Sequence, residues 1–176
     1  EQPHKANLEK IPQLRPAFAE GGTITPANSS SISDGASALL LASEGAVASH
    51  ALKARARIVA HARNSLAPED FTLAPIGAAE QVLAKAGWSA SDVDLWEINE
   101  AFAMVTMLTT RALDLDPACV NVHGGACAQG HPIGSTGSRI IVTLMHALEH
   151  YGKQRGVAAL CIGGGEATAV AIELVA

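Results

Sequence analysis

GGACAQGHPIGSTGSR, residues 124–139, holds five glycines, one cysteine, one histidine and one proline in sixteen positions. Such a stretch can bind a phosphate, ligate a metal or place a histidine for catalysis. Its glycines match neither the GxGxxG nor the GxxxxGK[ST] pattern of phosphate-binding loops. His131 has no second His, Asp or Glu nearby at a ligand spacing, and His123 lies eight residues upstream. We therefore expect neither a phosphate loop of these types nor a metal site.

A catalytic histidine fits this stretch better. Gly130 and Pro132 flank His131, and the proline biases the histidine backbone toward an extended conformation. The glycines allow the main chain to approach a ligand closely. A histidine held in this way suits general acid/base work or activation of a thiol. Taken alone, the stretch is explained equally well as a glycine-rich turn with a solvated histidine.

Outward from this stretch, predicted strands alternate with predicted helices. Apolar runs predict strands at 36–43, 56–62, 94–98, 119–122, 156–162 and 167–175. Helical spacing predicts helices at 74–87, at 99–113 and through Ile141–Leu148. The last two strands are joined by a glycine turn and read as an antiparallel hairpin. The alternation predicts an α/β layered domain with a mixed sheet.

Composition excludes several classes of function. The chain has 176 residues, of which 48% are apolar and 16% charged, so it can bury a core. With a net charge of −5 and no basic cluster longer than KARAR (53–57), a nucleic-acid surface is not expected. The three cysteines form no CxxC pair, so neither a disulfide framework nor a zinc site is indicated. Reduced thiols fit a cytoplasmic enzyme, and a lysosome-like or organelle matrix location stays open as the alternative. No apolar run is long enough to span a membrane.

Two further stretches carry candidate chemistry. In LCIGGG (160–165), Cys161 ends an apolar strand and enters three glycines. Free backbone N–H groups there can form an oxyanion hole, and a nearby histidine could turn the thiol into a base. The alternative for Cys161 is a small buried hydrophobe. In EINEAFA (97–103), Asn99 stands at a strand-to-helix junction, where it can cap the helix or hold a water or ligand.

Together these stretches resemble a known family. NEAFA (99–103), GGACAQGHPIGSTGSR and CIGGG (161–165), in this order and spacing, resemble the thiolase family of acyl-CoA acyltransferases. Upstream, LRPAF and GGTITPANSSSISDGASAL resemble the loop and final strand of the first thiolase half. The resemblance implies a layered αβαβα fold of two similar halves. Residues 1–50 would be the loop and last strand of the amino-terminal half, and 51–176 the carboxy-terminal domain.

The resemblance also implies roles for individual residues. His131 would activate the nucleophilic cysteine and, with a water held by Asn99, polarise the thioester oxygen. Cys161 would be the acid/base that takes an α-proton from the second acyl-CoA and protonates the departing coenzyme A. The Gly163 amide would complete the second oxyanion hole. Four positions match those that line the pantetheine or thioester end of coenzyme A: Phe18, Ser30, Ala101 and Phe102.

One departure from the family matters most. The family's nucleophile is a first-half cysteine at a strand-to-helix turn followed by an SG-type motif, whereas the cysteines here read CVN, CAQ and CIG. Cys127 of CAQ takes an aliphatic position and is expected in the core. The resemblance therefore implies a carboxy-terminal fragment that is inactive alone, with an amino-terminal thiolase half as its partner. When intact, such a protein would form a homo-dimer or tetramer.

Coenzyme A or acyl-CoA would be the substrate, with no covalently bound cofactor and no metal. The reaction would cleave 3-ketoacyl-CoA or condense two acetyl-CoA, and the sequence leaves direction and acyl chain length open. Pro26 and Gln129 depart from the family pattern near the expected acyl site. A further departure is GGGEA, which replaces a common GGGQG. Two alternatives remain: a non-catalytic acyl-CoA or lipid-binding module of thiolase-like fold, and a hydrolase that uses Cys161 and His131.

Overall fold

The computed structural model describes residues 6–175; residues 1–5 and 176, the outer ends of the two expected segments, lie outside it. The elements alternate as the sequence pattern predicts, with short 3-10 helices (η) between them. In chain order they are η1 (Leu8–Gln13), α2 (Glu44–Ser49), β1 (Ala56–Ser65), η2 (Pro68–Asp70), α3 (Ala74–Ala86), η3 (Ala90–Asp92), β2 (Leu95–Ile98), α4 (Ala103–Ala112), η4 (Pro117–Cys119), α5 (Ala126–Gln129), α6 (Thr136–Tyr151), β3 (Arg155–Cys161) and β4 (Glu166–Leu174).

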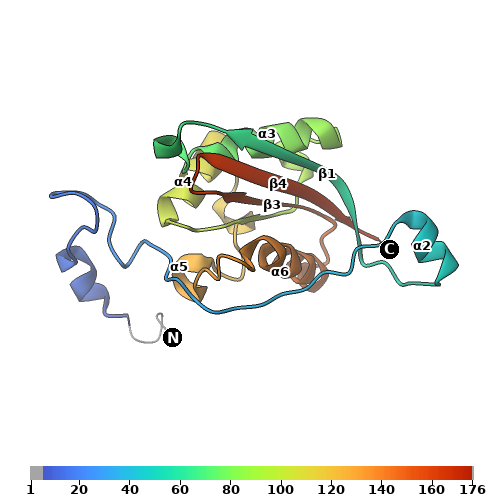
Figure 1. Ribbon diagram of the computed structural model, residues 1–176, viewed down its shortest axis with the longest axis horizontal. Coiled ribbons are helices and arrows are strands. Elements are labelled where there is room, and N and C mark those ends of the chain that lie inside the picture. The colour runs from blue at the N-terminus through green and yellow to red at the C-terminus, as the bar shows by residue number, and fades with distance from the viewer. Residues whose placement is uncertain (1–5, 176) are drawn as a thin grey trace.

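The four strands form one mixed sheet in the order β1-β4-β3-β2. β4 runs antiparallel to both of its neighbours, while β2 and β3 are parallel. The predicted hairpin of the last two strands is thereby confirmed. Its turn needs glycine at Gly165, where φ is +101° and a Cβ would collide with the Leu66 carbonyl oxygen. Helix α3 covers one face of the sheet and α6 the other (Figure 1).

Each helix packs on the sheet through side chains of a different size. On the α3 side, alternate residues of β4 are alanines, among them Ala167 and Ala169, and they lie in one buried cluster with Ala78 and Val82 of α3. On the α6 side, larger residues such as Leu144 fill the space. Pro75 near the start of α3 and Gly87 at its end, with φ +70°, are the helix signals that the sequence displayed.

Two predicted strands are wrong. Residues 36–43 are extended but unpaired, and Leu40 and Leu41 are 88% and 71% exposed. An apolar run forms a strand only where a neighbouring strand accepts its hydrogen bonds, and no such strand is present among residues 6–175. The strand predicted at 119–122 shrinks to a single parallel bridge between Val120 and Trp96. Asn121, with φ +49°, turns the chain away at once.

The amino-terminal part of the chain crosses the molecule as an extended segment that runs beside α5 and α6 (Figure 1). Residues 29–37, here called the strap, are fastened to two loops of the domain. Ser30 bonds to the Ala101 carbonyl oxygen, and the Ser37 hydroxyl lies 2.7 Å from that of Ser135. The strap thus ties together the loop that follows β2 and the loop that precedes α6. No helix within residues 6–175 is long and apolar enough to cross a membrane.

Candidate active site

His131 lies in the loop between α5 and α6 and is fixed on both sides. Its backbone N–H donates to the Ser31 carbonyl oxygen of the strap over 2.8 Å. Its Nδ1 lies 2.7 Å from the Thr136 hydroxyl oxygen, and that hydroxyl donates its own proton to the Pro132 carbonyl oxygen at 3.0 Å. The hydroxyl must therefore accept from Nδ1–H, which leaves Nε2 as the bare nitrogen. Nε2 of His131 carries no proton and can therefore act as a base.

Asn99 follows β2 and faces that base. It is 1% exposed, and its backbone N–H donates to the Ala159 carbonyl oxygen. Its side-chain Nδ2 lies 3.5 Å from His131 Nε2, while its Oδ1 is buried without a hydrogen-bond partner. The predictions that Asn99 caps a helix and that the helix begins at residue 99 are both wrong. Helix α4 begins at Ala103, after extended backbone at Phe102. The Asn99 side chain therefore keeps one buried acceptor, Oδ1, without a hydrogen bond.

Cys161 is the last residue of β3 and lies at the same end of the strands as Asn99. β2 and β3 are parallel neighbours in which Ile98 pairs with Ala159, so both candidates stand at the carboxyl ends of adjacent strands. Burial raises the pKa of the Cys161 thiol, so the sulfur keeps its proton at neutral pH. The thiol can act as a proton donor as it stands. Within residues 6–175, no hydrogen bond joins it to His131 or Asn99.

Gly163 lies in the exposed turn between β3 and β4. The turn is closed by a bond from the Ile162 N–H to the Glu166 carbonyl oxygen and by one from the Gly165 N–H to the Ile162 carbonyl oxygen. Neither bond uses the Gly163 N–H, which donates to no backbone oxygen of the described chain. It therefore has the donor that an oxyanion hole requires, directly after Cys161 and Ile162.

The four residues expected at the coenzyme A end of the site come together, although more than 70 positions separate Ser30 from Ala101. Both the backbone N–H and the hydroxyl of Ser30 donate to the Ala101 carbonyl oxygen, at 3.1 and 2.9 Å. The Phe102 ring packs edge-on against Phe18, with 5.9 Å between ring centroids. Phe18 is 74% exposed, so this group forms an open apolar wall rather than a closed pocket.

Sequence reasoning missed an ion pair behind Asn99. Glu97 of β2 is 2% exposed, and its Oε2 lies 3.7 Å from Nη1 of Arg139 on α6. Burial raises the pKa of Glu97 to about 7, although the Arg139 charge opposes that change. Burial and Arg139 both lower the pKa of His131, so the imidazole is uncharged at neutral pH. The sequence did carry a signal for this pair. Glu97 is a charged residue in a predicted strand, two places before Asn99, and alternate residues of a strand share a face.

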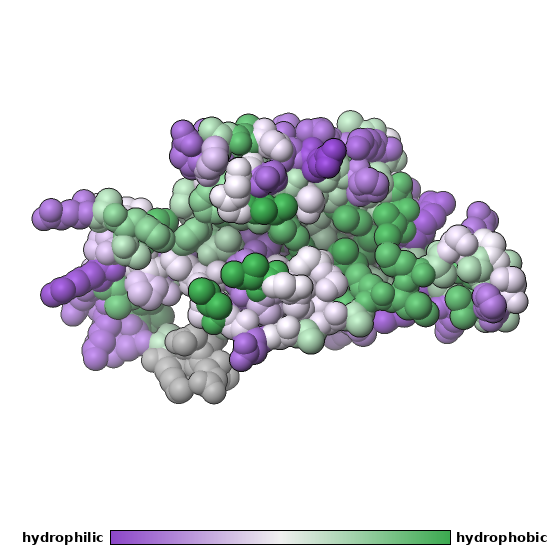
Figure 2. Space-filling model, viewed as in Figure 1, coloured by the Kyte–Doolittle hydropathy of each residue, from purple (hydrophilic) through white to green (hydrophobic). Residues whose placement is uncertain are grey.

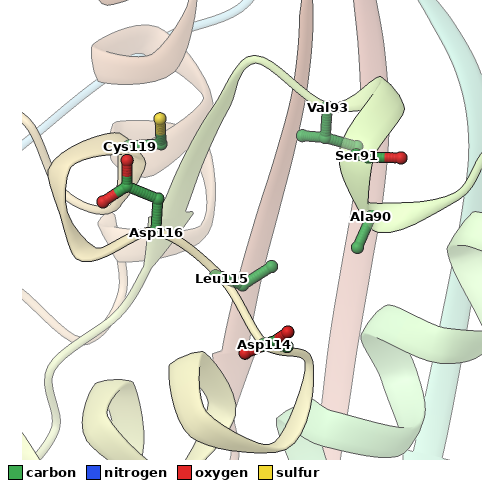
Figure 3. Close-up of a pocket in the computed structure, with 7 residues that line it drawn as sticks. All are labelled: Ala90, Ser91, Val93, Asp114, Leu115, Asp116 and Cys119. Atoms are coloured by element: carbon green, nitrogen blue, oxygen red, sulfur yellow. The ribbon is translucent and has the colours of Figure 1, made fainter.

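The other two cysteines stand apart from this arrangement. Cys127 of α5 is only partly buried, and its backbone N–H donates to the Glu100 carboxylate. Burial and that carboxylate raise the pKa of its thiol to about 11, so it is a poor nucleophile. Cys119 borders a cavity of about 180 Å³ that contains none of the candidate catalytic residues (Figure 3). The cavity is lined by Ala90, Ser91, Val93, Asp114, Leu115, Asp116 and Cys119.

Comparison with known families gives a clear result. Residues 52–174 match the model of the thiolase C-terminal domain, and residues 1–45 match that of the thiolase N-terminal domain. The chain belongs to the thiolase family. It is 49% identical over 173 residues to the probable acetyl-CoA acetyltransferase of Dictyostelium discoideum, covering 98% of this chain and 42% of that protein. It is 48% identical over 172 residues to the cytosolic acetyl-CoA acetyltransferase of Mus musculus, covering 97% and 43%.

Solved thiolase structures share the fold. The acetyl-CoA acetyltransferase of Bacillus anthracis superposes with a TM-score of 0.93 at 41% identity, covering 96% of this chain and 43% of that one. Human mitochondrial 3-ketoacyl-CoA thiolase in complex with CoA gives 0.90 at 40% identity, covering 98% and 44%. The thiolase-like fold expected from the sequence is confirmed. The chain spans less than half the length of the relatives it matches.

Proposed function

We propose that the whole thiolase catalyses acyl transfer between an enzyme cysteine and coenzyme A, with this chain supplying the acid/base half of the site. The observation that carries the proposal is the facing pair of His131 and Asn99. The first offers a bare Nε2, and the second a buried amide oxygen that lacks a partner. A base beside an unsatisfied polar group is suited to a reaction in which a proton moves while charge develops on a nearby oxygen.

The residues divide the reaction between them. His131 Nε2 accepts the proton of the nucleophilic thiol, whose sulfur then attacks the thioester carbonyl carbon and takes the acyl group as coenzyme A leaves. The Cys161 thiol gives its proton to the departing coenzyme A and is left as a thiolate. In the condensing direction, that thiolate removes the α-proton of the second acyl-CoA. The resulting carbanion attacks the acyl-cysteine, whose sulfur leaves and recovers its proton from His131. In cleavage the same steps run backwards, and the protonated Cys161 thiol returns the proton to carbon. The raised pKa of that thiol supports the donor role.

In this scheme, negative charge develops on a substrate oxygen at two places. We assign to Asn99 and His131 the role of holding a water against the enolate oxygen of the second acyl-CoA, which the 3.5 Å approach of their side chains supports. The unpaired Gly163 N–H is a donor for the second oxyanion. The α-proton of a thioester is weakly acidic, so this stabilisation must be present while the base acts.

Coenzyme A is the proposed substrate, and its pantetheine end is placed against Phe18, Ser30, Ala101 and Phe102. The exposed aromatic wall of Phe18 and Phe102 supports this placement, as does the coenzyme A bound to the human relative of the same fold. The sources of the two acyl groups stay open between cleavage of 3-ketoacyl-CoA and condensation of acetyl-CoA. Two relatives are acetyl-CoA acetyltransferases by name, which favours a short acyl group.

The nucleophilic cysteine is proposed to come from an amino-terminal thiolase half. Cys127 is held as an unreactive thiol, and Cys119 lies beside a separate cavity. Apolar side chains also reach the surface along the unpaired segment 36–43, and Ile58 of β1 is 49% exposed. Figure 2 shows apolar surface, in green, on this side of the molecule. A face of this kind is typical of a surface that another chain segment covers. We place the assembled dimer or tetramer in the cytoplasm, where the mouse relative resides by name.

The test uses the chain fused behind an amino-terminal thiolase half. In heavy water, the fused protein should exchange the α-protons of acetyl-CoA for deuterium, which mass spectrometry measures. The Cys161→Ala variant should lose this exchange, whereas Cys127→Ala should keep it. Exchange that survives Cys161→Ala would refute the role of Cys161. Binding of acetyl-CoA without any exchange in the parent protein would instead favour a non-catalytic acyl-CoA-binding module.

A further inference from the structure

The strap, residues 29–37, contacts both catalytic loops although it adds nothing to the core. None of its residues is buried, and Ile32 is 88% exposed. The burial of apolar surface that holds the helices on the sheet therefore does not hold the strap. Hydrogen bonds and close main-chain contacts hold it instead, and they go to the residues around Asn99 and His131.

The first end of the strap pairs with the loop that follows Asn99. Ser29 forms an antiparallel bridge with Phe102. Both the backbone N–H and the hydroxyl of Ser30 donate to the Ala101 carbonyl oxygen, which lies two residues after Asn99. The loop cannot move relative to the strap without breaking these bonds. The strap thereby fixes the chain directly after Asn99.

The middle of the strap pairs with His131 itself. The His131 backbone N–H donates to the Ser31 carbonyl oxygen at 2.8 Å, and Ile32 forms a parallel bridge with His131. At the far end of the strap, the Ser37 hydroxyl lies 2.7 Å from that of Ser135, directly before α6. The strap therefore holds the backbone of the histidine and the turn that follows it.

Glycine is required on both chains where the strap passes closest to the His131 loop. A Cβ on Gly35 would lie 2.7 Å from Cγ and 2.8 Å from Cβ of Pro132, so that one of the two chains would have to move. A Cβ on Gly130 would collide with the hydroxyl oxygen of Ser33. One of these glycines belongs to the strap and the other precedes His131. The two chains are therefore fitted to each other by main-chain contact.

We infer that the strap positions His131 against Asn99, and that Gly35 is a positioning residue because it sets how closely the strap approaches the His131 loop. The inference deepens the proposed function, since it rests on His131 acting as the base. A single segment holds the chain beside both residues, so a displaced strap releases the 3.5 Å approach of Asn99 Nδ2 to His131 Nε2. The strap lies in the match to the N-terminal thiolase domain, and His131 in the match to the C-terminal domain. One domain of the thiolase thus places the base of the other.

The first test follows His131 by NMR in the 176-residue chain, where no turnover is needed. Gly35→Ala sets a methyl group against Pro132, so the strap should be pushed away. Protection of the His131 backbone N–H from hydrogen exchange should then fall by about tenfold or more. The nuclear Overhauser contact between the Asn99 side-chain amide and the His131 ring should weaken as well. Gly45→Ala is the matched control and should change neither, because a Cβ there meets nothing within 4 Å.

A second pair of variants tests the far attachment of the strap. Ser37→Ala removes the hydroxyl that contacts Ser135 and should lower the protection of the His131 N–H. Ser37→Thr keeps a hydroxyl and should restore the protection. If Gly35→Ala fails to fold, this pair decides in its place, and a loss in Ser37→Thr as large as in Ser37→Ala would overturn the inference.

The third test measures thiolysis of acetoacetyl-CoA by the chain fused behind an amino-terminal thiolase half. Gly35→Ala should lower kcat by about ten- to a hundredfold, because a base displaced by about 1 Å loses that much, while KM stays nearly constant. A merely structural role would reduce the amount of folded enzyme, counted by circular dichroism, without lowering kcat per folded molecule. Gly45→Ala should keep the kcat and KM of the parent.

Unchanged protection of the His131 N–H in Gly35→Ala, or an equal loss in Gly45→Ala, would overturn the inference. A loss of activity carried by KM alone would do the same, because the strap would then act on coenzyme A and not on His131. A parent fusion without turnover would refute the proposed function. The exchange measurement would still decide whether the strap holds His131, so the two can fail separately.

Discussion

Glu97 makes the stability of this chain depend on pH in an unusual direction. Its pKa rises from the ordinary 4.5 to about 7 in the folded chain, chiefly because it is buried. The folded state therefore binds more protons than the unfolded state between these two values, and stability must fall as the pH rises through that window. Each pKa unit corresponds to about 1.4 kcal/mol. A difference of about 2.5 units, from 4.5 to about 7, gives a loss of about 3 kcal/mol.

Urea unfolding at a series of pH values from 4 to 8 measures this loss, and Glu97→Gln is the matched variant. Glutamine imitates the protonated carboxyl group, so the variant should lack the Glu97 part of the pH dependence. The difference in unfolding free energy between variant and wild type isolates that part, because the other titrating groups are common to both. The variant should gain about 3 kcal/mol on the wild type as pH rises through the window. A difference that is independent of pH, or that grows in favour of the wild type, would refute the reasoning.

Three further outcomes are expected. Leu148→Ala, at a fully buried residue of α6, should lower the unfolding free energy by about 2–5 kcal/mol in denaturant titrations. Leu40→Ala, at an 88% exposed residue, should change it little, and equal losses would contradict the assignment of the core. Gly165→Ala should cost about 1 kcal/mol or more, since φ there is +101°, as judged from the thermal midpoint. Thr136→Val should release the His131 tautomer, seen in the imidazole nitrogen shifts, while Thr136→Ser should preserve it.

Patterns local in sequence predicted much of this fold. Helix α3 carries its own start and stop signals in Pro75 and Gly87, and the closing hairpin carries its glycine turn. The failures share a cause that lies outside the local pattern. Residues 36–43 have the composition of a buried strand but find no strand to pair with, and Val120 is stopped by the turn at Asn121. Strand prediction from composition cannot see whether a partner edge is present.

The site was predictable to a similar depth. Motifs predicted Asn99 and Cys161 at the carboxyl ends of strands and His131 before a helix, and these three positions in the fold are confirmed. They did not reveal that the Asn99 side chain faces His131 with its Oδ1 unpaired, rather than capping a helix, because that depends on where α4 begins. The Glu97–Arg139 pair was invisible for a different reason. Its residues are 42 positions apart and meet only when α6 packs on β2.

The central claim is that this thiolase chain holds the acid/base residues and needs a nucleophile from an amino-terminal half. The most direct measurement is thiolysis of acetoacetyl-CoA by the purified chain, by the chain fused behind that half, and by the fused His131→Ala variant. The account predicts no turnover by the chain alone, turnover by the fused protein and a loss of turnover with His131→Ala. Turnover by the chain alone, or a fused His131→Ala variant as fast as its parent, would contradict it.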